Sequence, residues 1–123
     1  MNQILWIALG GAIGAVLRYT LALGITSFWP IEYPIPTLLV NLLGCFAIGA
    51  VYAAFATHAN FQETLRPFLI IGVLGGFTTF SSFAMESVEL LKSSQHLKAF
   101  SYIALSNFIG ILAAYMGFKL FTI

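Results

Sequence analysis

The sequence predicts an all-α membrane protein with four transmembrane helices. The chain has 123 residues, of which 60% are hydrophobic and only 7% are charged. A soluble domain needs about a quarter of its residues charged, so this chain cannot cover itself with a soluble surface. Four apolar segments reach the roughly 20 residues that a spanning helix needs. We expect one four-helix unit over residues 1–123, with spans at about 4–24, 33–56, 65–91 and 99–120.

The first expected span carries two features, a glycine pair and an arginine. Gly10 and Gly14 are four residues apart, and small residues at this spacing let helices approach closely in lipid. We expect them to serve helix packing. Arg18 follows the apolar run too closely to lie in bulk water. It either anchors the end of the helix at the interface or gives a vestibule a positive potential that concentrates anions.

The second expected span lies between two connecting segments and contains one polar residue. The stretch "SFWPIEYPIP" has three prolines and several aromatic residues, which is typical of a loop at the membrane surface. Asn41 opens the motif "NLLGCFAIG". A buried asparagine in hydrocarbon either hydrogen-bonds to a neighbouring helix or faces a cavity that holds water or a ligand. The polar stretch "THANFQETLRP" is expected to be a turn.

The third expected span is interrupted by "GGFTTFSSF", residues 75–83. Glycine, serine and threonine are weak helix formers, and non-helical backbone at membrane depth is tolerated only inside protein or along a cavity. We therefore expect a helix broken in mid-membrane, or a kink repaired by serine and threonine side chains. Free carbonyl groups between Gly75 and Thr78 would suit a cation with oxygen ligands, such as Na⁺.

Phenylalanines recur every third residue through the same stretch. Phe80 and Phe83 share one face if the segment after the break is helical. The edge of a phenyl ring is positive and attracts an anion without carrying a full charge. Nearby donors are Thr79, Ser81, Ser82, Ser106 and the amide of Asn41. This mixture suits a small, strongly hydrated anion, and an aromatic packing stripe remains the alternative.

The fourth expected span has one face that changes from hydroxylated to small residues. Its members, three or four residues apart, are Tyr102, Ser106, Gly110, Ala113 and Gly117. This face either packs against another helix or forms a polar track.

The basic residues give no preferred orientation in the membrane. If the N-terminus is cytoplasmic, the inner loops carry Arg66 and Lys119, and the outer loops carry Lys92 and Lys98. The positive-inside rule then favours neither orientation, and insertion both ways would permit an antiparallel homodimer. A net charge of +1 argues against nucleic acid as a partner. No metal-ligand pair or nucleophile–base pair suggests an enzyme.

Three motifs together resemble the Fluc (CrcB-type) fluoride channels. They are "GGAIGAVLRY" in the first span, "NLLGCFAIG" in the second and "GGFTTFSSF" in the third. With chain length and span number, the resemblance covers essentially the whole chain. It implies an antiparallel, dual-topology homodimer in the cell (inner) membrane. Two pores of this dimer would export fluoride passively and selectively, and so relieve fluoride toxicity.

The resemblance also implies a role for individual residues. Asn41 would be a pore-lining donor, and Phe80 and Phe83 would turn their ring edges toward fluoride. A structural Na⁺ at the dimer centre would be held by the backbone carbonyls of Gly75 and Thr78. The other implied positions are pore hydroxyls at Ser81 and Ser82, polar-track residues at Tyr102 and Ser106, and a vestibule arginine at Arg18.

Two other functions were weighed against this one. A small multidrug resistance-type, proton-coupled exporter needs a carboxylate in the first span, where this chain has only Arg18. A non-transporting assembly subunit would use its polar residues as contacts between helices. The second alternative leaves the phenylalanine pair and the interrupted span unexplained.

Overall fold

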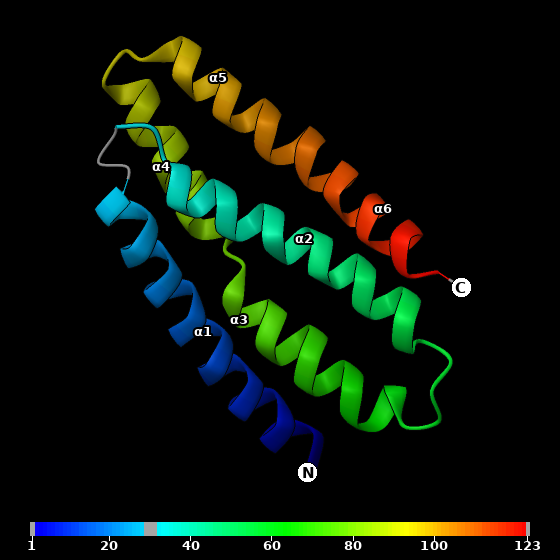
Figure 1. The fold of residues 1–123 in the computed structure, drawn as a ribbon. Helices are drawn as coiled ribbons and strands as arrows, with labels where there is room; N and C mark the ends of the chain where they lie inside the picture. The colour runs from blue at the N-terminus through cyan, green and yellow to red at the C-terminus, as the bar shows by residue number, and fades with distance from the viewer. Residues whose placement is uncertain (1, 29–31, 123) are drawn as a thin grey trace.

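The chain folds entirely into helices that run back and forth along one long axis (Figure 1). The computed structural model describes residues 2–28 and 32–122. The elements are α1 (Asn2–Phe28), α2 (Ile35–Phe55), η1 (Phe61–Leu74), α3 (Gly75–Phe77), α4 (Phe80–Lys92), α5 (His96–Ala104), η2 (Leu105–Ile109) and α6 (Gly110–Phe121).

Four helical runs are long and apolar enough to cross a membrane: Asn2–Phe28, Ile35–Phe55, Phe61–Lys92 and His96–Phe121. The shortest has 21 residues, which at 1.5 Å per residue extends about 31 Å and matches a hydrocarbon core of about 30 Å. The predicted all-α class with four membrane-capable helices is confirmed. In Figure 1 the free ends of α1 and α6 lie toward the same end as the α2–η1 turn, and the α4–α5 turn lies at the opposite end.

Both predicted connecting segments are shorter than the sequence suggested. The third span was expected to begin at about residue 65, after the "THANFQETLRP" turn, but η1 already begins at Phe61 and continues through Pro67. Phe61 is buried against Tyr52, with ring centroids 5.7 Å apart, and this contact holds the first turn in place. The winding of η1 is of the wider π type; for example, the amide of Leu65 donates to the carbonyl of Asn60.

The "SFWPIEYPIP" loop was expected to begin after the first span, but Phe28 still belongs to α1. On its other side, α2 starts at Ile35, so Pro36 lies in the first helical turn. A proline is tolerated there because the amide it lacks would have no helical partner. Residues 29–31, in the middle of this predicted loop, lie outside the described part of the chain.

Glycines allow two pairs of helices to touch through their backbones. A Cβ atom on Gly14 would collide with the carbonyl oxygen of Val73, and one on Gly76 would lie 2.6 Å from the carbonyl oxygen of Gly11. The expected packing role of the glycines in α1 is thereby confirmed. α2 and α6 meet in the same way through Gly49 and Gly117. The first contact matters most for the site because it fixes α1 against η1 and α3.

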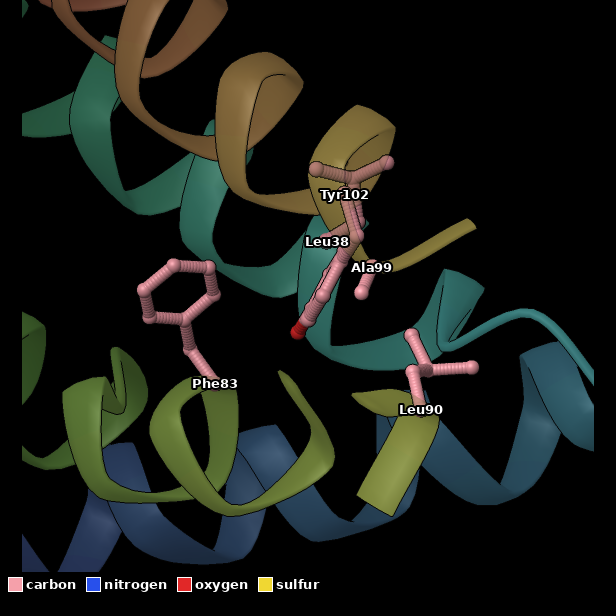
Figure 2. Close-up of a cluster of buried hydrophobic side chains, with 5 residues drawn as sticks. All are labelled: Leu38, Phe83, Leu90, Ala99 and Tyr102. Carbon is pink, nitrogen blue, oxygen red and sulfur yellow. The ribbon is translucent and has the colours of Figure 1, made fainter. Parts of the chain in front are cut away.

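A buried apolar cluster ties α4 to α2 and α5. Figure 2 shows side chains from all three helices converging, with the hydroxyl end of Tyr102 turned toward α4. Ala99 and Tyr102 have no exposed surface, and Phe83 stacks at 5.2 Å from the Tyr102 ring. The cluster consists of Leu38, Phe83, Leu90, Ala99 and Tyr102. Because Phe83 belongs to it, the start of α4 is held at a defined place beside α2.

Candidate functional site

The helical backbone conformation stops for two residues between α3 and α4. Thr78 (φ −85°, ψ 158°) and Thr79 (φ −149°, ψ 113°) are extended. The amide and hydroxyl of Thr78 both donate to the carbonyl of Leu74, at 3.0 and 2.9 Å. The hydroxyl of Thr79 accepts from the amide of Ser82 at 3.1 Å. The first threonine therefore closes the preceding helix, and the second caps the N-terminus of α4. We call residues 78–79 the interruption.

Asn41 of α2 is joined to the interruption by two hydrogen bonds. Its Nδ2 donates to the carbonyl of Thr79 at 3.0 Å, and the Thr79 amide donates to its Oδ1 at 2.8 Å. This pairing supplies the partners that Thr79 lacks outside a helix. Of the two alternatives for Asn41, a helix–helix contact and a cavity-facing amide, the geometry satisfies both. One of its two amide hydrogens remains after the bond to Thr79, and Asn41 also lines a cavity.

A cavity of about 340 Å³ lies beside the interruption. It brings together many residues that the sequence singled out: Asn41, Gly75, Thr78, Phe80, Phe83 and Ser106. The rest of its wall is formed by Gly44, Cys45, Ile48, Ile70, Leu74, Thr79 and Asn107. No residue in this wall carries a charge. We call this space the aromatic cavity.

Two phenylalanines form one side of the aromatic cavity. The ring centroids of Phe80 and Phe83 are 5.5 Å apart, and the ring planes are inclined by 53°. Phe83 is buried, whereas Phe80 is 76% exposed. The two rings therefore lie on one face of α4, as expected, but Phe80 stands at the rim and Phe83 in the core. α4 begins here, and the amides of a helix N-terminus carry a partial positive charge.

Ser106 contributes a buried hydroxyl without a partner. Its Oγ atom is inaccessible to solvent and makes no hydrogen bond with any described residue, and the residue belongs to the wall of the aromatic cavity. Buried polar atoms are nearly always paired with protein or water. The hydroxyl is thus a covered donor, which a rotation of the Ser106 side chain would have to expose before a ligand in the cavity could use it.

Tyr102 lies one turn before Ser106 but has a different environment. Its hydroxyl donates to Oε1 of Glu86 at 2.8 Å, and the Thr37 hydroxyl donates to Oε2 of the same carboxylate at 2.9 Å. Tyr102 is fully buried and does not line the aromatic cavity. Sequence reasoning missed this three-residue network. The available signal was spacing, because Thr37 lies one helical turn before Asn41 and Glu86 lies three residues after Phe83.

A second cavity, of about 190 Å³, holds the predicted vestibule arginine. We call it the arginine cavity. Its lining residues are Arg18, Tyr19, Ala22, Pro36, Thr37, Val40, Thr79 and Ser82. Ser82 therefore faces this cavity rather than the aromatic one, and Ser81 is exposed and lines neither. Thr79 belongs to both walls, so the interruption adjoins both cavities.

Arg18 reaches the interruption directly. Its Nε donates to the carbonyl oxygen of Gly76 at 3.1 Å, in a partly buried position. Gly76 lies in the last turn of α3, where carbonyls lack helical donors and carry a partial negative charge. Arg18 therefore both contacts the backbone of α3 and lines the arginine cavity, and its role as an interfacial anchor or a vestibule residue stays a prediction.

The backbone carbonyls of Gly75 and Thr78 could supply some, but not all, of the oxygen ligands that a cation needs. No described side chain donates to either oxygen, whereas Gly76 and Thr79 each accept from one. Ends of broken membrane helices are the kind of backbone that coordinates Na⁺ in transporters. Two carbonyls are fewer than the roughly six oxygens around a hard cation such as Ca²⁺, so one copy of the chain provides at most part of a site. Within the described residues, no three His, Cys, Asp or Glu side chains gather as metal ligands.

Four membrane-capable helices and a polar opening between them define a multi-pass helical membrane protein. Comparison with known proteins then identifies the family. Residues 5–118 match the family described as CrcB-like protein, Camphor Resistance (CrcB), and the chain belongs to that family. The resemblance inferred from the three motifs is confirmed.

The chain is similar along nearly its whole length to proteins named Fluoride-specific ion channel FluC. The protein from Stutzerimonas stutzeri (strain A1501) is 45% identical over 114 residues, which cover 93% of this chain and 92% of that relative. The one from Flavobacterium psychrophilum is 42% identical over 117 residues, with 95% and 94% covered. The one from Chloroflexus aurantiacus is 44% identical over 117 residues, with 95% and 93% covered.

Proposed function

We propose that the protein is a fluoride-selective ion channel, not an enzyme, through which fluoride leaves the cell passively and its toxicity is relieved. The relatives that carry the name of fluoride-specific channels match more than nine-tenths of both chains. The structural observation that carries the proposal is the aromatic cavity. There the phenylalanine pair, the amide of Asn41 and the unpartnered hydroxyl of Ser106 meet at the N-terminus of α4.

The composition of the aromatic cavity suits fluoride. A strongly hydrated anion enters a protein only if donors replace its water shell, and it leaves only if no single site binds it too tightly. Asn41 and Ser106 offer hydrogen-bond donors, and the edges of Phe80 and Phe83 offer weak positive potential. The wall holds no lysine or arginine, so nothing in it would trap the ion.

The remaining predicted pore residues would contact fluoride outside the aromatic cavity, before or after it passes the phenylalanine pair. Arg18 and Ser82 face the arginine cavity, which suits a vestibule where anions gather before they pass the interruption. Ser81 would meet the ion at the exposed start of α4. Tyr102 would take part only if its hydroxyl exchanged Glu86 for the ion, because that hydroxyl is hydrogen-bonded in this structure.

The working channel is an antiparallel, dual-topology homodimer. Balanced basic residues on the loops support insertion in both orientations. The 76% exposure of the Phe80 ring at the rim of the aromatic cavity supports a second copy that completes the wall. A two-fold axis in the membrane plane pairs each depth with the opposite depth, so interruptions that lie at mid-depth would meet across it. There the carbonyls of Gly75 and Thr78 from each copy would together hold one Na⁺.

The test is fluoride efflux from liposomes that contain the purified protein, followed with a fluoride electrode. We expect fast fluoride loss that depends on the protein, and no matching loss when the liposomes contain chloride. Protein-free liposomes control for leak. Loss of both anions would refute selectivity. Absence of fluoride loss from folded dimers would refute the channel and favour an assembly subunit. The exporter alternative is set aside because the chain belongs to the CrcB family and α1 has no carboxylate.

A further inference from the structure

The carbonyl groups around the interruption fall into two classes. Those of Gly76 and Thr79 accept hydrogen bonds from side chains of other helices, Arg18 of α1 and Asn41 of α2. Those of Gly75 and Thr78 accept from no described side chain. Between residues 75 and 79, the carbonyls of Gly76 and Thr79 are therefore engaged by side chains, and those of Gly75 and Thr78 remain open.

The position of Arg18 is fixed by the helix contact beneath it. α1 lies directly on η1 and α3, because Gly14 and Gly76 leave no room for a side chain between the backbones. Arg18 follows Gly14 by one turn, and so its side chain starts beside the last turn of α3. It is partly buried, and in the described part of the chain no carboxylate pairs with it. Its partner is the backbone.

Only the Nε atom of Arg18 makes this bond. The two terminal amino groups of the guanidinium are left for the arginine cavity that the residue lines. The Nε–H group, here called the inner donor, and the charged terminal amino groups, here called the outer charge, can thus have separate roles. The inner donor acts on the backbone of α3, and the outer charge acts on whatever enters the cavity.

We infer that Arg18 is a positioning residue for the cation site at the interruption. Its Nε–H occupies the carbonyl of Gly76 and so fixes the last turn of α3, while the carbonyls of Gly75 and Thr78 accept from no described side chain. The Nδ2 group of Asn41, on α2, likewise occupies the carbonyl of Thr79. The inference rests on the proposed Na⁺ site for its ligand, but the contact with Gly76 is tested independently of that ion.

Two substitutions separate the donor from the charge. In Arg18→Gln, the side-chain Nε2 occupies the same position along the chain as arginine Nε, so the donor stays and the charge is lost. In Arg18→Lys, a methylene group occupies that position, so the charge stays and the donor is lost. Arg18→Met lacks both and serves as the matched reference.

The first readout is the sodium concentration that half-maximally raises the unfolding temperature of the purified protein, with potassium as the control salt. We expect Arg18→Gln to keep the parent value. Arg18→Lys and Arg18→Met should need about ten times more sodium, since both lose the hydrogen bond to the Gly76 carbonyl. If lysine retains the parent value and glutamine does not, the charge of Arg18 acts on the site and the positioning role is refuted.

The second readout is amide hydrogen exchange across residues 76–82, measured without sodium. Arg18→Met and Arg18→Lys should exchange faster there by about tenfold, with η1 unchanged and Arg18→Gln like the parent. Equal exchange in all four proteins would overturn the inference. If the parent protein does not respond to sodium, the proposed cation fails, while the exchange experiment still decides whether Arg18 holds the backbone.

Discussion

At the scale of single residues, Phe80 and Phe83 show how one motif serves two purposes. Phe83 is buried against Tyr102 and holds α4 in place, whereas Phe80 is exposed at the rim of the aromatic cavity. A change at Phe83 would disturb folding and conduction together. Phe80 is therefore the position at which the ring edge can be tested with the fold intact.

We predict that Phe80→Ile lowers the rate of fluoride efflux about fivefold, because isoleucine keeps the apolar bulk and loses a ring-edge interaction of about 1 kcal/mol. Its unfolding temperature should remain that of the parent. The measurement is the initial efflux rate from liposomes. Phe100→Ile is the control, since Phe100 is 63% exposed on α5 and lines neither cavity. Equal rates for the two variants would remove Phe80 from the path.

Asn41→Asp should abolish fluoride efflux. The carboxylate cannot donate to the Thr79 carbonyl, which the Asn41 amide now holds at 3.0 Å, and it adds a negative charge to the wall of the aromatic cavity. Like charges repel strongly where water is scarce. Asn60→Asp, in the exposed turn before η1, is the control and should conduct as the parent does. Conduction by Asn41→Asp at the parent rate would exclude Asn41 from the pore.

At the scale of elements, the contact of α1 with η1 and α3 sets the register of the site. Gly14→Ala should destabilise the protein by about 1 to 3 kcal/mol, because the new methyl group meets the Val73 carbonyl in a backbone contact that has no room to relax. Gly24→Ala is the matched control in the same helix, since a Cβ there has no neighbour within 4 Å. Denaturant titration of both variants compares the two free energies of unfolding. A stable Gly14→Ala protein would show that the two helices are not tightly packed.

The structural elements that depend on local helix propensity could be predicted from the sequence. Four long apolar segments and one stretch rich in glycine, serine and threonine predicted the helices and marked residues 75–83, where Thr78 and Thr79 lie. The start of the third span was predicted too late, because burial of Phe61 outweighed the polar composition of the residues around it.

Contacts between distant residues could not be predicted in the same way. The bonds of Asn41 to Thr79 and of Arg18 to Gly76 join residues 38 and 58 positions apart. They depend on how α1 and α2 are placed against α3 and α4, which periodicity does not specify. The resemblance to a family assigned Asn41 and Arg18 to the path of the ion. The geometry adds that both also hold the backbone at which the helix is interrupted.

At the scale of the whole molecule, the proposed dimer depends on the orientation of each copy in the membrane. The α2–η1 turn and the α4–α5 turn lie at opposite ends of the bundle (Figure 1), and the basic residues near them are balanced. Orientation should therefore respond to a small added charge, since lysine and arginine favour the cytoplasmic side. An antiparallel dimer needs both orientations at once, so fixing one orientation removes its partner.

Two double variants test whether the channel needs both orientations. Thr57→Lys with Gln62→Lys adds charge at the α2–η1 end, and Ser93→Lys with His96→Lys adds it at the α4–α5 end; all four side chains are exposed. Reporters fused to the C-terminus should place it on a single side of the membrane in each double variant, and on opposite sides in the two variants. In the parent protein they should detect it on both sides. Each double variant alone should lose fluoride efflux, and co-expression should restore it. Efflux from one double variant of fixed orientation would mean that the channel is not antiparallel, because all its copies would then point the same way.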